Sequence, residues 1–330
     1  MDCVVAVDVG GTTMKGGLVG RDGALLYVER RATPRAEGPE RVVAAVSAFV
    51  TDLSRPRPVG SDGAVLEPVA VGLAVPGLVT ATHAVFSAAL GWRDVPVEAF
   101  TQVSLPVALG HDVRSAGEAE LAYGSGTGTI ADARTGSTSG TDTGTGAGVD
   151  AGADARSGAG DVLYLPIGTG IAGAVVLSGR LYGGAAGWAG QIGHIPVWPD
   201  GVLCACGQRG CLAAYASASA IAARCGEDSA ADVVARVATG DAQATEVWNE
   251  AVEALSLALA TYTLLLDPAL VVIGGGLSLA GDTLIAPLRT RLSARLTFRH
   301  PPALRVSTLG VHAGLMGAGL MGWRAHEDHV

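Results

Sequence analysis

The chain has 330 residues, of which 49% are hydrophobic and 16% charged, and its net charge is −9 with an isoelectric point of about 5.2. That length is enough for two domains, each with its own core. The acidic charge argues against nucleic acid or an anionic membrane as the main partner. The chain starts without a basic leader, and its longest apolar run, at 254–266, is too short to cross a bilayer. We therefore expect a cytoplasmic protein.

Hydrophobic periodicity and turn residues divide the chain into alternating strands and helices. In the first part, strands are predicted at 3–9, 24–30, 69–73 and 107–109, with helices at 39–53 and 112–123. A further strand is predicted directly after the glycine turn that follows Val9. In the second part, strands are predicted at 162–168, 171–177, 270–276 and 303–308, with helices at 219–225, 230–239, 244–266, 282–296 and 314–325. This alternation indicates α/β layers.

Residues 124–160 differ from the rest of the chain. They are mostly Gly, Thr, Ser, Ala and Asp, and Ile130 is the single large aliphatic residue before Val149. Such a segment buries too little apolar area to offset the entropy of ordering it. We predict a disordered, low-complexity insertion here.

Three glycine-rich turns follow three apolar strands, at 8–15, 167–173 and 273–278. Glycine lets backbone N–H groups approach an anion closely, so a row of glycines can form a phosphate nest. Each turn alone is as well explained by a structural role, but three together point to phosphate. In the first turn, Asp8 could orient Mg²⁺ or its water, and Lys15 or the threonine hydroxyls could meet phosphates. Because a strand follows that turn, neither a P-loop nor a dinucleotide fingerprint is expected.

His111 and Asp112 lie where a strand passes into a helix. An aspartate at this position is commonly a helix cap. Beside phosphate turns, it could instead be a general base that takes the proton of a hydroxyl attacking a γ-phosphate.

One histidine and three cysteines have the spacing H-x9-C-x-C-x4-C: His194, Cys204, Cys206 and Cys211. Three thiolates and an imidazole satisfy tetrahedral Zn²⁺ and leave no open position, so the metal would be structural. The alternative is a set of buried free thiols. Gly207 and Gly210 favour the metal, since they supply the turns that a tight ligand loop needs.

The motifs together resemble the ROK family of bacterial sugar kinases, which share the actin/hexokinase-like ATPase fold. The matching stretches include DVGGTTMKGGLV, GLAVPGLV, HDVRSAGEAELAYG, LYLPIGTGIAGAVVLSGRLYGG, CACGQRGCL, LDPALVVIGGGLS and LGVHAGLMGAG. The resemblance implies an α/β fold of two domains that close over ATP and a sugar. The N-terminal domain would comprise 1–110 and 313–330, and the C-terminal domain, with the zinc loop, 111–312. It also implies a homo-oligomer, a dimer or tetramer.

The resemblance further implies roles for individual residues. Asp112 would be the catalytic base, and the histidine zinc ligand would also face the sugar. Phosphate, Mg²⁺ and adenosine would be bound by Asp8, Gly10, Gly11, Thr12, Lys15, Gly168, Thr169, Gly170, Gly274, Gly275 and Gly276. The substrate would be bound by His111, Asp112, Gln191 and His194.

Four positions depart from the pattern of family glucokinases. His111 and Ala89 stand where those enzymes usually have asparagine, and Gln191 and Ala213 where they have glutamate. A site built to bond a hydroxyl discriminates sharply by its presence, so we expect a substrate other than glucose. The resemblance supplies a candidate, because some ROK-like kinases of secondary metabolism phosphorylate the primary hydroxyl of a C7 cyclitol. By that analogy we favour a carbocyclic substrate of the 2-epi-5-epi-valiolone type, phosphorylated on its primary (7-) hydroxyl.

Three alternatives are open. The first is a glucokinase or another hexose 6-kinase, for example one acting on N-acetylmannosamine. The second is a non-catalytic sugar binder. The third is a DNA-binding repressor, which is disfavoured because the first phosphate strand begins near Cys3 and leaves no room for a preceding helix-turn-helix.

Overall fold

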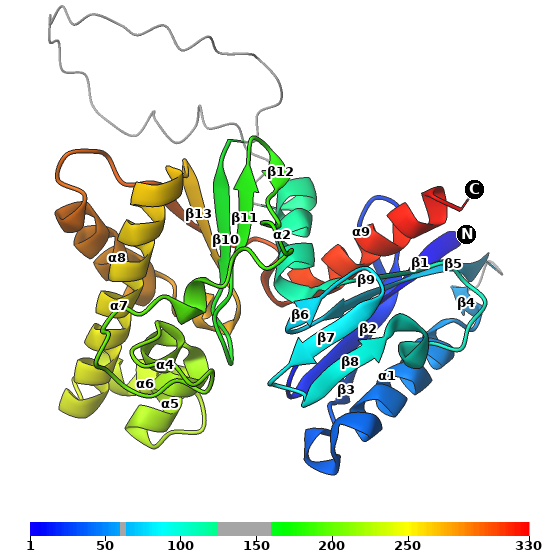
Figure 1. The fold of residues 1–330 in the computed structure, drawn as a ribbon, viewed down its shortest axis with the longest axis horizontal. Helices are drawn as coiled ribbons and strands as arrows, with labels where there is room; N and C mark the ends of the chain where they lie inside the picture. Colours follow the sequence, from blue (N-terminus) through cyan, green and yellow to red (C-terminus); the bar gives the residue numbers. More distant parts are fainter. Residues whose placement is uncertain (60–63, 125–159, 330) are drawn as a thin grey trace, which may run out of the picture.

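The computed structural model describes residues 1–59, 64–124 and 160–329. These form two lobes, each built around its own β-sheet (Figure 1). The predicted insertion at 124–160 lies outside the described residues, except for its two end residues. Within the described ranges, no helix is long and apolar enough to cross a membrane.

The N-terminal lobe is built on a sheet with the strand order β3-β2-β1-β5-β4, and β9 also pairs with β5. The strand bounds are β1 Asp2–Val9, β2 Thr13–Val19, β3 Leu25–Ala32, β4 Arg57–Val59, β5 Ala64–Val75 and β9 Val107–His111. β1 and β9 both run parallel to β5, whereas β2 is antiparallel to β1. A small antiparallel sheet adds β6 Leu78–Val79, β7 His83–Ser87 and β8 Trp92–Pro96.

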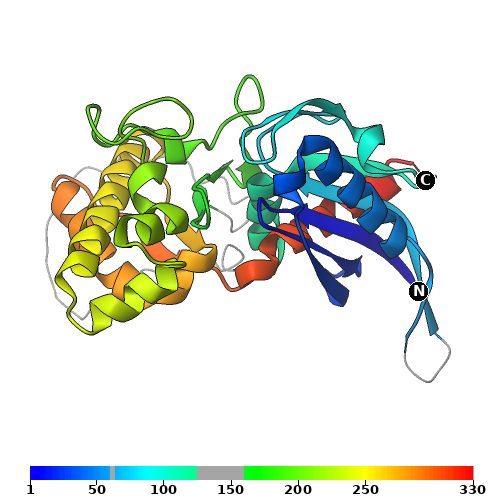
Figure 2. The same cartoon turned by 90° about the horizontal axis from the view of Figure 1, so that it is seen from below.

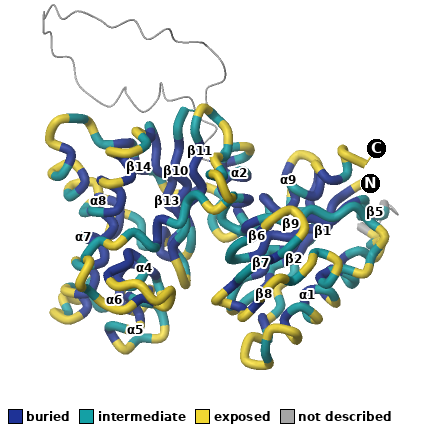
Figure 3. Tube along the Cα trace, viewed as in Figure 1, coloured by how far each residue is buried: buried dark blue, intermediate teal, exposed yellow. Residues whose placement is uncertain are grey.

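The C-terminal lobe has a second mixed sheet, in the order β12-β11-β10-β13-β14. Its strands are β10 Val162–Pro166, β11 Ala174–Leu177, β12 Arg180–Leu181, β13 Leu270–Gly274 and β14 Ala303–Val306. Strands β10, β13 and β14 are parallel to one another, whereas β11 is antiparallel to β10. Figure 3 shows that the strands of both sheets are largely buried, whereas the outer loops are exposed.

Helices cover the sheets and connect the lobes (Figure 2). In the N-terminal lobe, α1 (Pro39–Leu53) covers one face, and α9 (Ala313–Glu327) covers the other. α2 (Asp112–Tyr123) packs on α9 and on β10 and β11, so it bridges the two sheets. The outer face of the C-terminal sheet is covered by α4 Ala213–Ala216, α5 Ala218–Cys225, α6 Ala230–Ala238, α7 Ala242–Leu266 and α8 Asp282–Arg295.

Most of the elements predicted from periodicity are confirmed, including the strand that directly follows the first glycine turn. The predicted strand at 171–177 is shorter and begins at Ala174. The sheet of β6, β7 and β8 was not predicted, because its strands are short and carry no regular alternation. The predicted domain boundaries at 110 and 313 stay a prediction.

One glycine fixes how closely α9 approaches its sheet. A Cβ atom at Gly72, in β5, would lie 1.8 Å from the carbonyl oxygen of Ala318 in α9. The backbones of strand and helix therefore meet without an intervening side chain, as only glycine allows.

We predict that Gly72→Ala destabilises the protein by about 2–3 kcal/mol, because the helix must move away from the sheet. Urea unfolding measures the effect. Gly183→Ala is the matched control, since a Cβ there makes only contacts of 3.7 Å or longer. Equal stability of the two variants would show that the helix can shift at no cost.

Candidate active site

A cavity of about 540 Å³ lies between the two lobes and is lined by residues of both. We call it the central cavity. All three glycine turns contribute to its wall. The predicted site residues among its lining are Asp8, Gly10, Gly11, Thr12, Lys15, His111, Asp112, Gly168, Thr169, Gly170, Gln191, Gly275 and Gly276.

Strand register brings the two carboxylates of this cavity together. Asp8 in β1 is paired with Ala74 in β5, and Val75 is paired with His111 in β9. Asp112 follows His111 directly. Because β1 and β9 flank β5 in parallel, the ends of both strands lie at the same edge of the sheet. Residues more than 100 positions apart in the chain thus share one site.

Backbone and side-chain hydrogen bonds hold the first glycine turn. Gly10 N–H donates to the carbonyl oxygen of Thr13 (3.1 Å), and the Thr33 hydroxyl donates to the carbonyl oxygen of Gly10 (2.7 Å). Lys15 Nζ lies 3.6 Å from Asp8 Oδ2 and donates to the carbonyl oxygen of Val311 (2.9 Å). The ammonium group is therefore held against the carboxylate at the cavity wall.

The turns leave backbone donors open toward the cavity. Within the described residues, no acceptor takes the N–H groups of Gly11, Thr12, Thr169 and Gly170. A Cβ atom at Gly11, Gly168, Gly170 or Gly276 would meet nothing within 4 Å. Unpaired N–H groups around open space fit a polyphosphate, which supplies many acceptor oxygens. Asp8 adds the oxygen ligand that Mg²⁺ prefers.

Burial dominates the electrostatics of the cavity. It raises the pKa of Asp8 to about 6, against the lowering effect of Lys15, and the charge of Asp112 raises it further. Burial also raises the pKa of Asp112 to about 6, although the N–H of Val113 donates to its Oδ1 at 2.7 Å. Both groups are thus carboxylates at pH 7 to 8 and lose their charge as the pH falls through 6. Asp112 combines a cap-like hydrogen bond with the pKa of a usable base.

His111 is a neutral imidazole at physiological pH. Burial lowers its pKa to about 4, and the charge of Arg114 lowers it further. Its Nδ1 accepts from Val113 N–H at 3.2 Å, which assigns the hydrogen to Nε2. His111 is also the residue that precedes the first turn of α2. It therefore offers a donor at Nε2, where an asparagine would offer both a donor and an acceptor.

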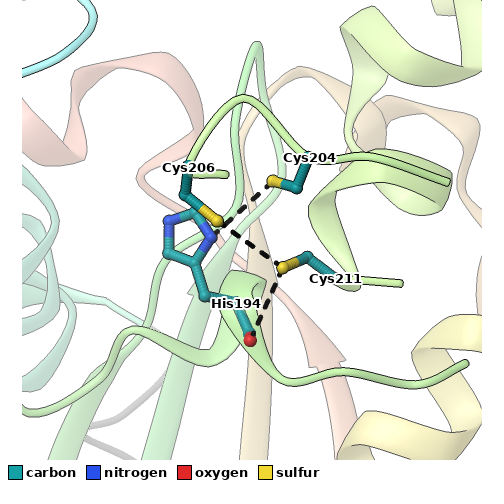
Figure 4. Close-up of side chains that lie close together, drawn as sticks. All are labelled: His194, Cys204, Cys206 and Cys211. Carbon is teal, nitrogen blue, oxygen red and sulfur yellow. Dashed lines mark hydrogen bonds between the residues drawn. The ribbon is translucent and has the colours of Figure 1, made fainter. Parts of the chain in front are cut away.

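The four predicted zinc ligands come together in one cluster (Figure 4). Their ligand atoms all lie within 4.8 Å of one another. Cys204 Sγ is 3.9 Å from His194 Nδ1, and Cys206 Sγ is 3.7 Å from Cys211 Sγ. Ligands at about 2.3 Å around a tetrahedral Zn²⁺ are about 3.8 Å apart, so the cluster fits that ion.

Two glycines shape the loop that carries these thiols. Gly207 (φ +92°) and Gly210 (φ +70°) have left-handed backbone conformations. A Cβ at Gly210 would also lie 1.5 Å from the carbonyl oxygen of Trp198. The sequence-based expectation that both glycines form ligand-loop turns is confirmed.

Some predicted residues lie outside the central cavity. Gly274, His194 and Ala213 are not among its lining residues. A Cβ at Gly274 would instead lie 2.7 Å from the hydroxyl of Tyr164. Ala89, one of the four altered positions, lines the cavity as well. Residues that sequence reasoning did not assign to the site also line it: Arg35, Pro76, Gly77, Val113, Ala116, Tyr164, Pro166, Ile171, Ala172, Gly310, Val311, Ala313 and Gly314.

Some of the lining residues that were not assigned to the site lie in sequence motifs that had been recognised. Pro76 and Gly77 lie in the matching stretch GLAVPGLV, and residues 309–314 lie in the matching stretch LGVHAGLMGAG, but neither stretch was assigned a role in the site. Gly314 is tied to the site by close packing, since a Cβ there would lie 2.5 Å from Asp8 Oδ2. Nothing in the sequence pattern marked Arg35, which comes from an exposed single turn (Arg35–Glu37).

Known proteins share this architecture over nearly the whole chain. The chain is 30% identical to a glucokinase of Halalkalibacterium halodurans, covering 96% of this chain and 93% of that protein. It is 29% identical to an N-acetylmannosamine kinase of Escherichia coli O157:H7, covering 96% and 97%. Among solved structures, a Streptomyces griseus ROK family glucokinase in complex with glucose and AMPPNP superposes with a TM-score of 0.77 at 25% identity, covering 98% and 99%.

Fold and cavity together define an enzyme of the sugar phosphotransferase class with the actin/hexokinase-like fold. The ROK family matches residues 4–160 and 151–324. The chain belongs to the ROK family.

The raised pKa of Asp112 has a consequence for stability. In the folded state this carboxyl keeps its proton up to about pH 6, whereas an ordinary aspartate loses it near 3.8. The unfolded chain therefore binds fewer protons between those values, and stability falls as the pH rises through them.

We predict that above pH 6 the free energy of unfolding of Asp112→Asn exceeds that of the wild type by about 1–2 kcal/mol, after allowing for solvent in the cavity. Below pH 4 the difference should vanish. Urea unfolding at both pH values, without nucleotide or Mg²⁺, measures it. Asp228→Asn, at an exposed site, should have the stability of the wild type at both pH values. An unchanged or lower stability of Asp112→Asn at pH 8 would contradict the view that burying the ionised Asp112 carboxylate costs free energy.

Proposed function

We propose that this enzyme transfers the γ-phosphoryl group of ATP, with Mg²⁺, to the primary hydroxyl of a C7 cyclitol of the 2-epi-5-epi-valiolone type, in preference to glucose. The main support for this proposal is that Ala89, His111 and Gln191 line the central cavity. A methyl group, a neutral imidazole and an amide stand where family glucokinases have two asparagines and a glutamate. The set of hydroxyls that the cavity can bind is changed accordingly.

Residue roles follow from the cavity chemistry. Bound ATP supplies the phosphoryl group, and Mg²⁺ offsets the charge that it carries. Asp8 holds Mg²⁺ or its water, and Lys15 lies beside that carboxylate. Asp112, ionised above pH 6, accepts the proton of the attacking hydroxyl. The open N–H groups of the glycine turns, at 11–12 and 169–170, would bind phosphate oxygens, and residues 274–276 would lie by the adenosine.

The substrate would meet Asp112 together with His111 and Gln191, whereas His194 lies outside the lining of the central cavity and would act as a zinc ligand. His111 donates through Nε2, and the Gln191 amide bonds hydroxyls more weakly than a carboxylate does. The fourth departure, Ala213, carries less weight because it does not line the central cavity. The proposal therefore rests on Ala89, His111 and Gln191. It further includes a cytoplasmic homo-oligomer, a dimer or tetramer, and a role in secondary metabolite biosynthesis.

Two other functions compete with this proposal. The names of the relatives favour a hexose 6-kinase acting on glucose or N-acetylmannosamine. A non-catalytic sugar-binding regulator would bind a sugar without releasing ADP. Turnover with a panel of acceptors separates all three.

We expect ADP release to be most efficient with a valiolone-type cyclitol, with kcat/KM at least about tenfold above those for glucose, mannose, fructose and N-acetylmannosamine. Asp112→Asn gives the baseline, because it lacks the base. Efficient turnover of glucose at low concentration would overturn the substrate assignment. Sugar binding with no turnover of any acceptor would support the regulator.

Gln191→Glu tests the same wall of the cavity. Restoring a carboxylate should raise kcat/KM for glucose about fivefold, because a charge-assisted hydrogen bond is roughly twice as strong as a neutral one. Gln102→Glu is the control, since Gln102 is exposed and far from the central cavity. A glucose rate that does not change, or that changes equally in both variants, would remove Gln191 from the specificity argument.

We also propose that the cluster of His194, Cys204, Cys206 and Cys211 binds one structural Zn²⁺. The four ligands leave no open position for chemistry. The loop at 194–211 packs through Trp198 on Tyr215 and through Leu212 into the C-terminal core. The metal would thus hold the segment that follows Gln191.

We predict about one zinc per chain by elemental analysis, and a loss of both zinc and thermal stability in Cys211→Ser. Cys225→Ser serves as the control, because Cys225 is also a buried thiol but lies in α5, outside the cluster. Carefully prepared protein that contains no zinc would refute the metal site.

A further inference from the structure

Tyr164 lies in β10 with its ring on the face of the strand opposite to Leu163 and Leu165. It is 3% exposed and belongs to the cluster between the lobes that includes Ala116 of α2 and Ala313 of α9. Both of these alanines line the central cavity, and so does Tyr164. The tyrosine therefore lies at the junction of the two lobes, with access to the cavity.

Two glycines make the slot that holds the ring. A Cβ at Gly117 in α2 would lie 3.7 Å from Cδ1 of Tyr164, and one at Gly274 would lie 2.7 Å from its hydroxyl oxygen. The ring is thus held between a helix and a glycine turn, and the hydroxyl is held beside the third glycine turn. A side chain fixed on both sides keeps its polar atom in one place.

No described residue forms a hydrogen bond with the Tyr164 hydroxyl, and its oxygen is not among the fully buried atoms without a partner, so it reaches the open space of the central cavity. A phenol oxygen at a cavity wall bonds water there, or a ligand that replaces the water. Packing alone does not account for the oxygen, since phenylalanine would fill the same slot. The cavity is the direction in which a partner for the hydroxyl can lie.

The charges around this hydroxyl determine what that partner can be. Burial raises the pKa of the Tyr164 phenol well above its ordinary value, and the carboxylates of Glu120, Asp8 and Asp112 raise it further. The phenol is therefore protonated at physiological pH and is a hydrogen-bond donor. Its partner must be an acceptor that enters the cavity, and the open N–H groups of the glycine turns call for the same kind of ligand.

We propose that Tyr164 is a nucleotide-binding residue whose hydroxyl donates a hydrogen bond to a phosphate oxygen of the bound nucleotide. This rests on the proposed ATP-dependent function but not on the identity of the acceptor. The hydroxyl lies beside Gly274, and Tyr164 lines the same cavity as Asp8, Asp112 and the open N–H groups of the glycine turns.

The test compares Tyr164→Phe with the wild type and with Tyr262→Phe. Tyr262 is a matched control: it is 6% exposed, it lies in α7 in the core of the C-terminal lobe, and its hydroxyl is buried without a described partner. Both substitutions remove one phenol oxygen from a largely buried tyrosine, but only Tyr164 lines the central cavity. Affinities for Mg²⁺-AMPPNP, Mg²⁺-ADP and adenosine are measured by isothermal titration calorimetry.

We expect Tyr164→Phe to weaken AMPPNP binding about tenfold or more, to leave adenosine binding unchanged, and to raise KM for ATP while KM for the acceptor stays constant. A parallel loss for ADP would assign the bond to the α- or β-phosphate, and a loss for AMPPNP alone to the γ-phosphate. Tyr262→Phe should match the wild type in all three titrations.

Equal AMPPNP affinity of Tyr164→Phe and wild type would overturn the proposal, as would an equal loss for adenosine. No AMPPNP binding by the wild type would overturn it as well. Because binding is measured without an acceptor, a wrong choice of cyclitol over hexose would appear in the turnover panel and would leave these titrations unaffected.

Discussion

The burial of two carboxylates in one cavity is the constraint on which the rest of this structure depends. Asp8 and Asp112 end up side by side because β1 and β9 both run parallel to β5 and end at the same edge. Their raised pKa values show that the folded protein holds charge where water is scarce. In the proposed function that cost is offset by Mg²⁺ and by the proton of the attacking hydroxyl, which are the partners that carboxylates bind in phosphoryl transfer.

Close backbone packing holds the cavity between the lobes. Gly72 lets α9 contact β5, Gly314 lets the start of α9 approach Asp8, and Gly117 lets α2 contact β11. α2 and α9 are thereby fixed both to their sheets and to each other. A side chain at any of these positions would separate elements whose contact defines the walls of the cavity. The glycine content of the chain thus serves the tertiary packing as much as the phosphate turns.

Much of the fold and of the site was predictable. Long periodic segments such as α7 gave clear elements, and strand-glycine junctions such as the one after Val9 marked the turns that meet at the cavity. The small sheet of β6, β7 and β8 was missed, because strands of two to five residues leave no periodic signal. Arg35 and Tyr164 were missed for a different reason: each reaches the cavity through packing between segments that are distant in sequence.

The sequence by itself determined the family, through motifs along most of the chain. It also gave the three glycine turns, the candidate base Asp112 and the His/Cys spacing, because each of these is encoded within a short segment. Only the tertiary structure decided which of the altered positions line the central cavity. It brings Ala89, His111 and Gln191 to the cavity and leaves Ala213 outside its lining. It also fixed the ionisation of Asp112 and His111, since burial depends on what packs around a residue and not on its neighbours in sequence.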